Sequence, residues 1–217
     1  MLASFNTSTK VTYNGLLEQC FDKYSYKCNI ISFKVFDRLD YLEGEGDTLT
    51  GIPTGKYGVT QTARLAVDKH GMLADMDVSM LYLNKLYGKW EGIDGFSESP
   101  IGLKEALLDL SYNVGESAFG YKGITQSLSE GNYKQAAINT LDTANSGGDL
   151  VLGLAKRRAI YFNVYAGESY IHEVVQDNNS ISYLGYDGGI IFKYKGNKHE
   201  LSNEGSVDIM PHSSLWM

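Results

Sequence analysis

The chain has 217 residues, which fits one domain of ordinary size or one domain with small additions at its ends. Hydrophobic residues make up 43% of it, enough for a substantial core, and the formal net charge of -7 gives no global attraction to nucleic acid or to an anionic surface. No stretch approaches the ~20 apolar residues of a membrane span, and the first residues carry no pattern of a secretory signal, so we expect neither.

The first thirty residues begin with a polar segment and then favour a helix from about Asn14 to Tyr24, because the apolar residues there share one face. Cys20 and Cys28 are the two cysteines of the sequence. Their spacing matches no metal motif, and two cysteines do not make a disulfide framework. We expect free thiols in a segment that serves packing or docking.

Apolar residues at helical spacing over about residues 35–42 predict a helix that ends where Gly, Thr and Pro begin to recur. Glu43 follows at its C-terminal end, where the negative end of the helix dipole disfavours an ionised carboxylate. A carboxyl group that keeps its proton suits a general acid. The hairpin predicted next supplies a second carboxylate, Asp47, and a hydroxyl, Thr54, which together make a workable glycosidase layout. The plain alternative is a solvated Glu at a helix end.

Two further helices are predicted before residue 91. The polar residues from Thr60 to Thr62 precede a short regular run and indicate an N-cap. Either Asp75 or Asp77 can cap the next helix, which we expect to end near Trp90. The Gly-rich and Ser-rich segment after it reads as a loop.

Residues 101–114 carry the clearest helical pattern, with apolar residues at i, i+3, i+4, i+7 and i+11. More than one face is apolar, so we expect this helix to be buried at the centre, and Gly115 is a natural stop. Asn113 lies at its C-terminal end. Its amide must find hydrogen-bond partners, which can be backbone groups or a ligand.

The rest of the chain changes character near Gly167. Before it, we expect a turn and a short helix over about 119–128, a helix over about 133–141, and a last helix from about 150 to 165, whose Lys156-Arg157-Arg158 triplet indicates a solvated basic face. After it, short β-type runs alternate with turn signals such as Asp187-Gly188-Gly189, which predict a hairpin.

Four stretches follow one another in a recognisable order. They are Leu42-Glu43-Gly44 with Thr54-Gly55-Lys56-Tyr57-Gly58, then Ala106 to Gly115 with Ala118-Phe119, then Ser127-Leu128 with Gly131-Asn132-Tyr133 and Ala136-Ala137, then Ser146-Gly147-Gly148 with Gly153 to Arg158. Together they resemble the phage-type lysozymes, the muramidase endolysins of bacteriophages. The resemblance covers about residues 36 to 166.

The resemblance implies an α+β, mainly helical lysozyme-like fold with a small β-hairpin at the active site. It also implies cleavage of the β-1,4 bond between N-acetylmuramic acid and N-acetylglucosamine in peptidoglycan, without metal or cofactor. The chain then divides into an N-terminal extension (1–30), a lysozyme-like catalytic domain (31–167) and a β-rich C-terminal appendage (168–217) outside the catalytic fold.

Carried over residue by residue, the family's acid is Glu43 and its Thr is Thr54. The interval between them is a few residues shorter than in the family, and Asp47 is the one Asp within it, so it is assigned as the second carboxylate with Glu45 as the alternative. Tyr57 and Asn113 are the substrate-binding candidates, and the last matches the Asn before the family's central Gly. Tyr161 stands where a Glu often follows the family's Arg pair.

Two biological roles are open for such a muramidase. One is an endolysin that waits in the host cytoplasm and acts in the periplasm on the cell wall, and the other is a virion-borne tail or baseplate lysozyme. The net charge of -7 and the extra end segments favour the second, because a free endolysin gains from positive charge at an anionic wall. Its partners would be peptidoglycan strands and phage tail proteins. The alternative from another class is a non-catalytic phage structural protein that keeps the fold.

Overall fold

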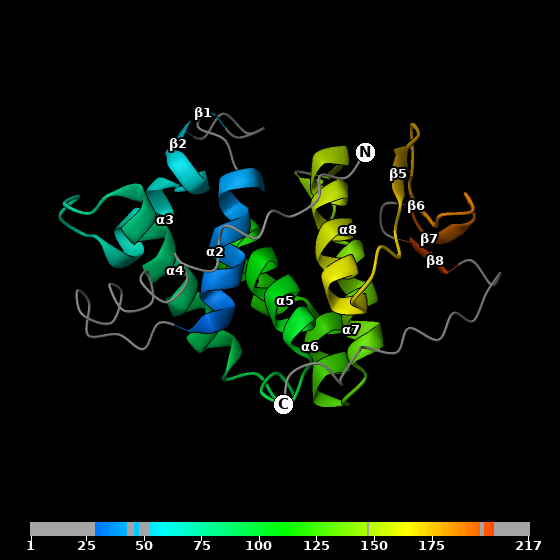
Figure 1. Cartoon of the computed structure of the whole chain (residues 1–217), viewed down its shortest axis with the longest axis horizontal. Coiled ribbons are helices and arrows are strands. Elements are labelled where there is room, and N and C mark those ends of the chain that lie inside the picture. The colour runs from blue at the N-terminus through cyan, green and yellow to red at the C-terminus, as the bar shows by residue number, and fades with distance from the viewer. Residues whose placement is uncertain (1–28, 43–45, 48–52, 147, 196–197, 202–217) are drawn as a thin grey trace.

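The computed structural model describes residues 29–42, 46–47, 53–146, 148–195 and 198–201 (Figure 1). Several sequence predictions lie outside these residues: the helix from Asn14 to Tyr24, Cys20, Cys28, Glu43 and Glu45. The side chains of Asp47 and Thr54 are also outside the described part, although their backbones are within it. None of the helices in the described ranges has the length and apolar character that a membrane crossing requires.

The described chain is mainly helical with small antiparallel sheets, which confirms the predicted α+β class. Its α-helices are α2 (Ile30–Leu42), α3 (Gln61–Val67), α4 (Asp75–Trp90), α5 (Ile101–Val114), α6 (Lys122–Ser129), α7 (Tyr133–Leu141) and α8 (Leu152–Ala166), with 3₁₀-helices η2 (Lys56–Gly58) and η3 (Gly115–Gly120). Its strands are β1 (Gly46–Asp47), β2 (Pro53–Thr54), β3 (Asn145–Ser146), β4 (Asp149–Leu150), β5 (Glu173–Gln176), β6 (Ile181–Leu184), β7 (Ile190–Lys195) and β8 (Lys198–Leu201). They form the ribbons β1–β2 and β3–β4 and a sheet in the order β5-β6-β7-β8.

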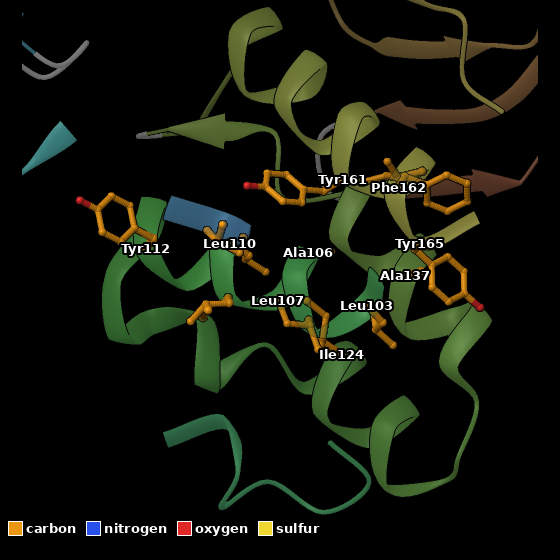
Figure 2. Packing of buried hydrophobic residues seen from close by; sticks show 14 of the residues in the cluster. Leu103, Ala106, Leu107, Leu110, Tyr112, Ile124, Ala137, Tyr161, Phe162 and Tyr165 are labelled. Carbon is orange, nitrogen blue, oxygen red and sulfur yellow. The ribbon is translucent and has the colours of Figure 1, made fainter. Parts of the chain in front are cut away.

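Helix α5 is the buried centre that its apolar pattern predicts. It lies between α2 and α8 in Figure 1, and α4 and α7 also pack against it. Figure 2 shows its apolar side chains packed with residues of the later helices, such as Ile124, Ala137 and Phe162. Gly102 lets α8 approach closely, because a Cβ there would lie 2.6 Å from the carbonyl oxygen of Val164. Gly115, with φ of 73°, ends the helix as expected.

The two predicted N-caps have different outcomes. The Thr60 Oγ1 accepts a hydrogen bond from the Ala63 N–H at 3.1 Å, so the cap of α3 is confirmed. The prediction that Asp75 or Asp77 caps α4 is wrong, because Ala74 occupies the N-cap and no side chain bonds there. Asp75 instead accepts hydrogen bonds from the Lys56 N–H and from the Arg64 guanidinium.

The β-type runs after Gly167 form the four-stranded sheet, which lies beyond α8 on the side away from α2 (Figure 1). The Asp-Gly-Gly turn joins β6 to β7 as predicted. Tyr183 and Phe192 of these strands belong to the main hydrophobic cluster, and the Tyr183 hydroxyl donates to the Leu141 carbonyl at 2.8 Å. The sheet therefore packs on the helices, while the division of the chain at residue 167 stays a prediction.

Candidate active site

The ribbon β1–β2 follows α2 directly in the chain, and Glu43 is the residue after the last one of that helix. The register pairs Gly46 with Thr54 and Asp47 with Pro53. Asp47 and Thr54 therefore belong to adjacent cross-strand pairs of one two-stranded ribbon. The structure thus brings the backbones of two predicted site residues together, beside the helix that leads to the third.

Tyr57 is held in an unusual backbone conformation beside this ribbon. Its φ of 60° lies in the left-handed region, which is uncommon for a non-glycine residue and costs it on the order of 1–3 kcal/mol; residues strained in this way cluster at functional sites. Its ring packs against Phe36 of α2 with centroids 4.9 Å apart. Its carbonyl oxygen accepts a hydrogen bond from the Tyr112 hydroxyl at 2.8 Å. That hydroxyl has one proton, so it accepts from the Ser79 hydroxyl at 3.0 Å. Tyr57 thereby contacts α2 and α5, and Ser79 of α4 holds its partner Tyr112.

A second set of contacts fixes the start of η2 to α4. The Lys56 N–H donates to Asp75 Oδ2 at 2.8 Å, and Arg64 of α3 pairs with the same carboxylate. Gly55 permits this contact, since a Cβ on it would lie 2.3 Å from Asp75 Oδ2. The Lys56 ammonium lies 5.1 Å from the centre of the Tyr57 ring. The Thr-Gly-Lys-Tyr-Gly stretch therefore forms a turn fastened from several sides.

Asn113 is half-buried at the end of α5. The sequence left open a backbone group or a ligand as its hydrogen-bond partner, but the structure shows a side chain of another helix. The Asn113 Oδ1 accepts a hydrogen bond from Arg158 Nη2 of α8 at 2.8 Å. Tyr112, one residue earlier, holds η2, so Asn113 lies at the end of α5 that adjoins the fastened turn. Its role in substrate binding stays a prediction.

Arg157 and Arg158 do not form the solvated face that the sequence indicates, and only Lys156 of that triplet is exposed. Arg157 is 6% exposed and Arg158 is 1% exposed. Both reach the fully buried carboxylate of Asp109 on α5: Arg157 through Nε and Nη2, at 3.0 and 2.6 Å, and Arg158 through Nη1 at 3.0 Å. The triplet prediction is wrong because a buried counter-charge from another helix replaces water.

A second buried carboxylate, Glu105, lies one turn earlier on α5 and faces α2. It pairs with Arg38 and with Lys34, the latter at 3.4 Å. The Arg38 guanidinium also lies 5.5 Å from the centre of the Tyr161 ring. Burial, with Asp109 nearby, raises the pKa of Tyr161 well above its ordinary value. Charged pairs thus join α5 to α2 on one side and to α8 on the other.

The sequence matches the family described as phage lysozyme over residues 47–160. No curated protein matches it. Several solved structures are similar to it, including the following three. The active form of the P1 phage endolysin Lyz has a TM-score of 0.49 and 14% identity, covering 70% of this chain and 92% of that one. The muramidase domain of SpmX from Asticaccaulis excentricus has a TM-score of 0.44 and 21% identity, and the match covers 62% of this chain and 95% of that one. The endolysin from Escherichia coli O157:H7 phage FAHEc1 has a TM-score of 0.43 and 20% identity, and the match covers 64% of this chain and 93% of that one.

Proposed function

The chain belongs to the phage lysozyme family, and from this premise we propose that it is a peptidoglycan hydrolase of the muramidase type. The bond cleaved is the β-1,4 link between N-acetylmuramic acid and N-acetylglucosamine. The observation that best supports this is the ribbon β1–β2, which carries Asp47 and Thr54 in adjacent cross-strand pairs directly after the helix that leads to Glu43. That ribbon also opens the stretch that matches the family.

In the proposed reaction, Glu43 gives its proton to the glycosidic oxygen as the bond from that oxygen to the sugar carbon breaks. Asp47 orients a water molecule and takes a proton from it as the water oxygen bonds to the same carbon. Thr54 holds that water by a hydrogen bond. Tyr57 and Asn113 contact the glycan strand. One water is consumed, two sugar ends are released, and no cofactor takes part.

Within this function, we propose the virion-borne version, in which the protein docks to phage tail or baseplate proteins and opens the cell wall. The support is the net charge of -7 and the segments at both ends of the family match. A free endolysin would gain from positive charge at an anionic wall.

Single substitutions tested on purified peptidoglycan check the proposal. Glu43→Gln keeps the shape and the hydrogen bonding of the side chain but has no proton to give, so turnover should fall by about 10²–10⁴-fold. Asp47→Asn should also reduce turnover, whereas Glu45→Gln should matter much less. Each variant is compared with the wild type after its melting temperature shows that it is folded.

The same three variants separate the alternatives. Loss of turnover in Glu45→Gln with full activity in Glu43→Gln would assign the acid to Glu45. A wild type that releases no sugar ends from any peptidoglycan would favour the non-catalytic structural protein, to which the short interval between Glu43 and Thr54 gives its support.

A further inference from the structure

Asn113 is held by its oxygen. Arg158 Nη2 lies 2.8 Å from Oδ1, and a guanidinium has only donors, so the amide must present its oxygen and not its nitrogen to it. The Nδ2, with two N–H groups, therefore points to the other side of the amide. Within the described part of the chain, Arg158 is the one hydrogen-bond partner of this side chain.

Arg158 itself is fixed, because each of its nitrogens is engaged by a different residue. Nε donates to the Thr143 hydroxyl at 2.9 Å, Nη1 to Asp109 Oδ2 at 3.0 Å and Nη2 to Asn113. The side chain is 1% exposed and Asp109 is 0% exposed. To turn away from Asn113, Arg158 would have to weaken a buried ion pair, which is strongly unfavourable.

We propose that Arg158 is a positioning residue that makes Asn113 a hydrogen-bond donor toward the glycan strand. The atom recognised is an acceptor oxygen of the sugar, such as a hydroxyl or an acetamido carbonyl. This inference rests on the proposed function. Its location is supported by Tyr112, the preceding residue, which bonds the carbonyl of Tyr57 and so places this end of α5 beside the candidate site.

The first test is Asn113→Asp. The aspartate keeps an acceptor for Arg158, and a charged one, so the melting temperature should stay equal or rise. It has no N–H, so kcat/KM on peptidoglycan should fall about tenfold, the size of one lost hydrogen bond near 1.4 kcal/mol. Full activity in this variant overturns the proposal.

Asn163→Asp is the matched control. The Asn163 amide on α8 bonds both the N–H and the carbonyl of Ile171, at 2.7 and 2.8 Å, so the change removes one donor there as well. It should lower the melting temperature and leave kcat/KM per folded molecule unchanged. An equal loss of kcat/KM in both variants would mean that the Asn113 effect is general and would also overturn the proposal.

The role of Arg158 is tested by a double-mutant cycle with Arg158→Lys and Asn113→Ala. If Arg158 acts through Asn113, Arg158→Lys lowers kcat/KM in the wild type but not in the Asn113→Ala background. Additive losses overturn the positioning role. If Arg158→Lys does not fold, Asn113→Asp and its control decide the question. A wild type without turnover ends the proposed function and this inference together, whereas an active wild type with an equally active Asn113→Asp ends this inference alone.

Discussion

Asp68 shows how much one carboxylate can organise at the residue scale. Its oxygens accept hydrogen bonds from the N–H groups of Met72 and Leu73, at 3.0 and 2.9 Å, and from Arg64 at 3.1 Å. These contacts close the loop between α3 and α4. The hydrogen bond from the Leu73 N–H contributes most to holding the pKa of Asp68 below its ordinary value. The ionised form of Asp68 therefore stabilises the folded state.

The direction of this shift predicts a pH dependence for Asp68→Asn. A depressed folded-state pKa gives stability that is present above the ordinary Asp value of about 3.9 and is lost as the pH falls through the folded value. The melting temperature of the variant should therefore lie below that of the wild type at neutral pH, and the two should converge in acid. Asp149→Asn, at an exposed position, is the control and should change the melting temperature little. A gap that stays constant down to pH 2 would contradict the prediction.

At this scale, the sequence predicted what depends on near neighbours and missed what depends on distant ones. Thr60 caps α3 because its partner is three residues away. Arg157 and Arg158 looked solvated because their counter-charge, Asp109, lies 48 and 49 residues earlier. Asp75 looked like a cap, but its carboxylate is used by η2 and α3. The sequence of a helix alone does not show whether its charged residues are buried, because that depends on opposite charges elsewhere in the chain.

At the element scale, α5 is joined to its two flanking helices by carboxylates one turn apart. Glu105 pairs with cations of α2 whose side chains are 32% and 29% exposed. Asp109 pairs with two arginines of α8 whose side chains are 7% and 1% exposed. The cations around Glu105 keep access to water and those around Asp109 do not. The two carboxylates should therefore differ in how much they contribute to stability.

This difference predicts unequal costs for Asp109→Asn and Glu105→Gln. Loss of the Asp109 charge removes the buried counter-charge that Arg157 and Arg158 share, which should lower the free energy of unfolding by about 3–5 kcal/mol. Loss of the Glu105 charge should cost clearly less, since Lys34 and Arg38 can turn to water. Chemical denaturation of both variants measures the two costs. Equal values would show that exposure of the cations does not govern them.

The elements themselves were largely predictable, because their periods are local properties of the sequence. The pattern of residues 101–114 gave α5 with its observed ends, and Asp-Gly-Gly gave the turn between β6 and β7. The ribbon β1–β2 followed from Gly, Thr and Pro after α2. The left-handed conformation of Tyr57 had no local signal, because it is imposed by contacts with Phe36 and Tyr112.

At the scale of the whole molecule, the C-terminal sheet and the helices share one hydrophobic cluster. Burial raises the pKa of the Tyr183 hydroxyl, and the same side chain is 0% exposed between the sheet and α7. A chain that ends at Gly167 would expose the surface of the helices that Tyr183 and Phe192 of the sheet cover. We therefore expect such a chain to be less stable than the full chain, whichever part carries the activity.

Two tyrosines of the sheet form a matched pair for testing this packing. Tyr183→Ala should lower the free energy of unfolding by about 3–5 kcal/mol, as expected for truncating a large buried ring. Tyr186→Ala should change it by less than about 0.5 kcal/mol, because that side chain is 87% exposed in the turn before β7. Chemical denaturation should show one transition for each variant. A small effect of Tyr183→Ala would mean that the sheet is not part of the cooperative unit.

The close approach at Gly102 has a consequence for how the molecule can move. A Cβ at this position would lie 2.6 to 2.9 Å from backbone atoms of Val164 and Tyr165, so α5 and α8 meet backbone against backbone. Shear motion needs side-chain layers that slide past one another, and no such layer separates the two helices here. They should travel as one rigid body, carrying Asn113 and Arg158 with them. Any rearrangement that accompanies ligand binding should therefore leave the spacing of α5 and α8 unchanged.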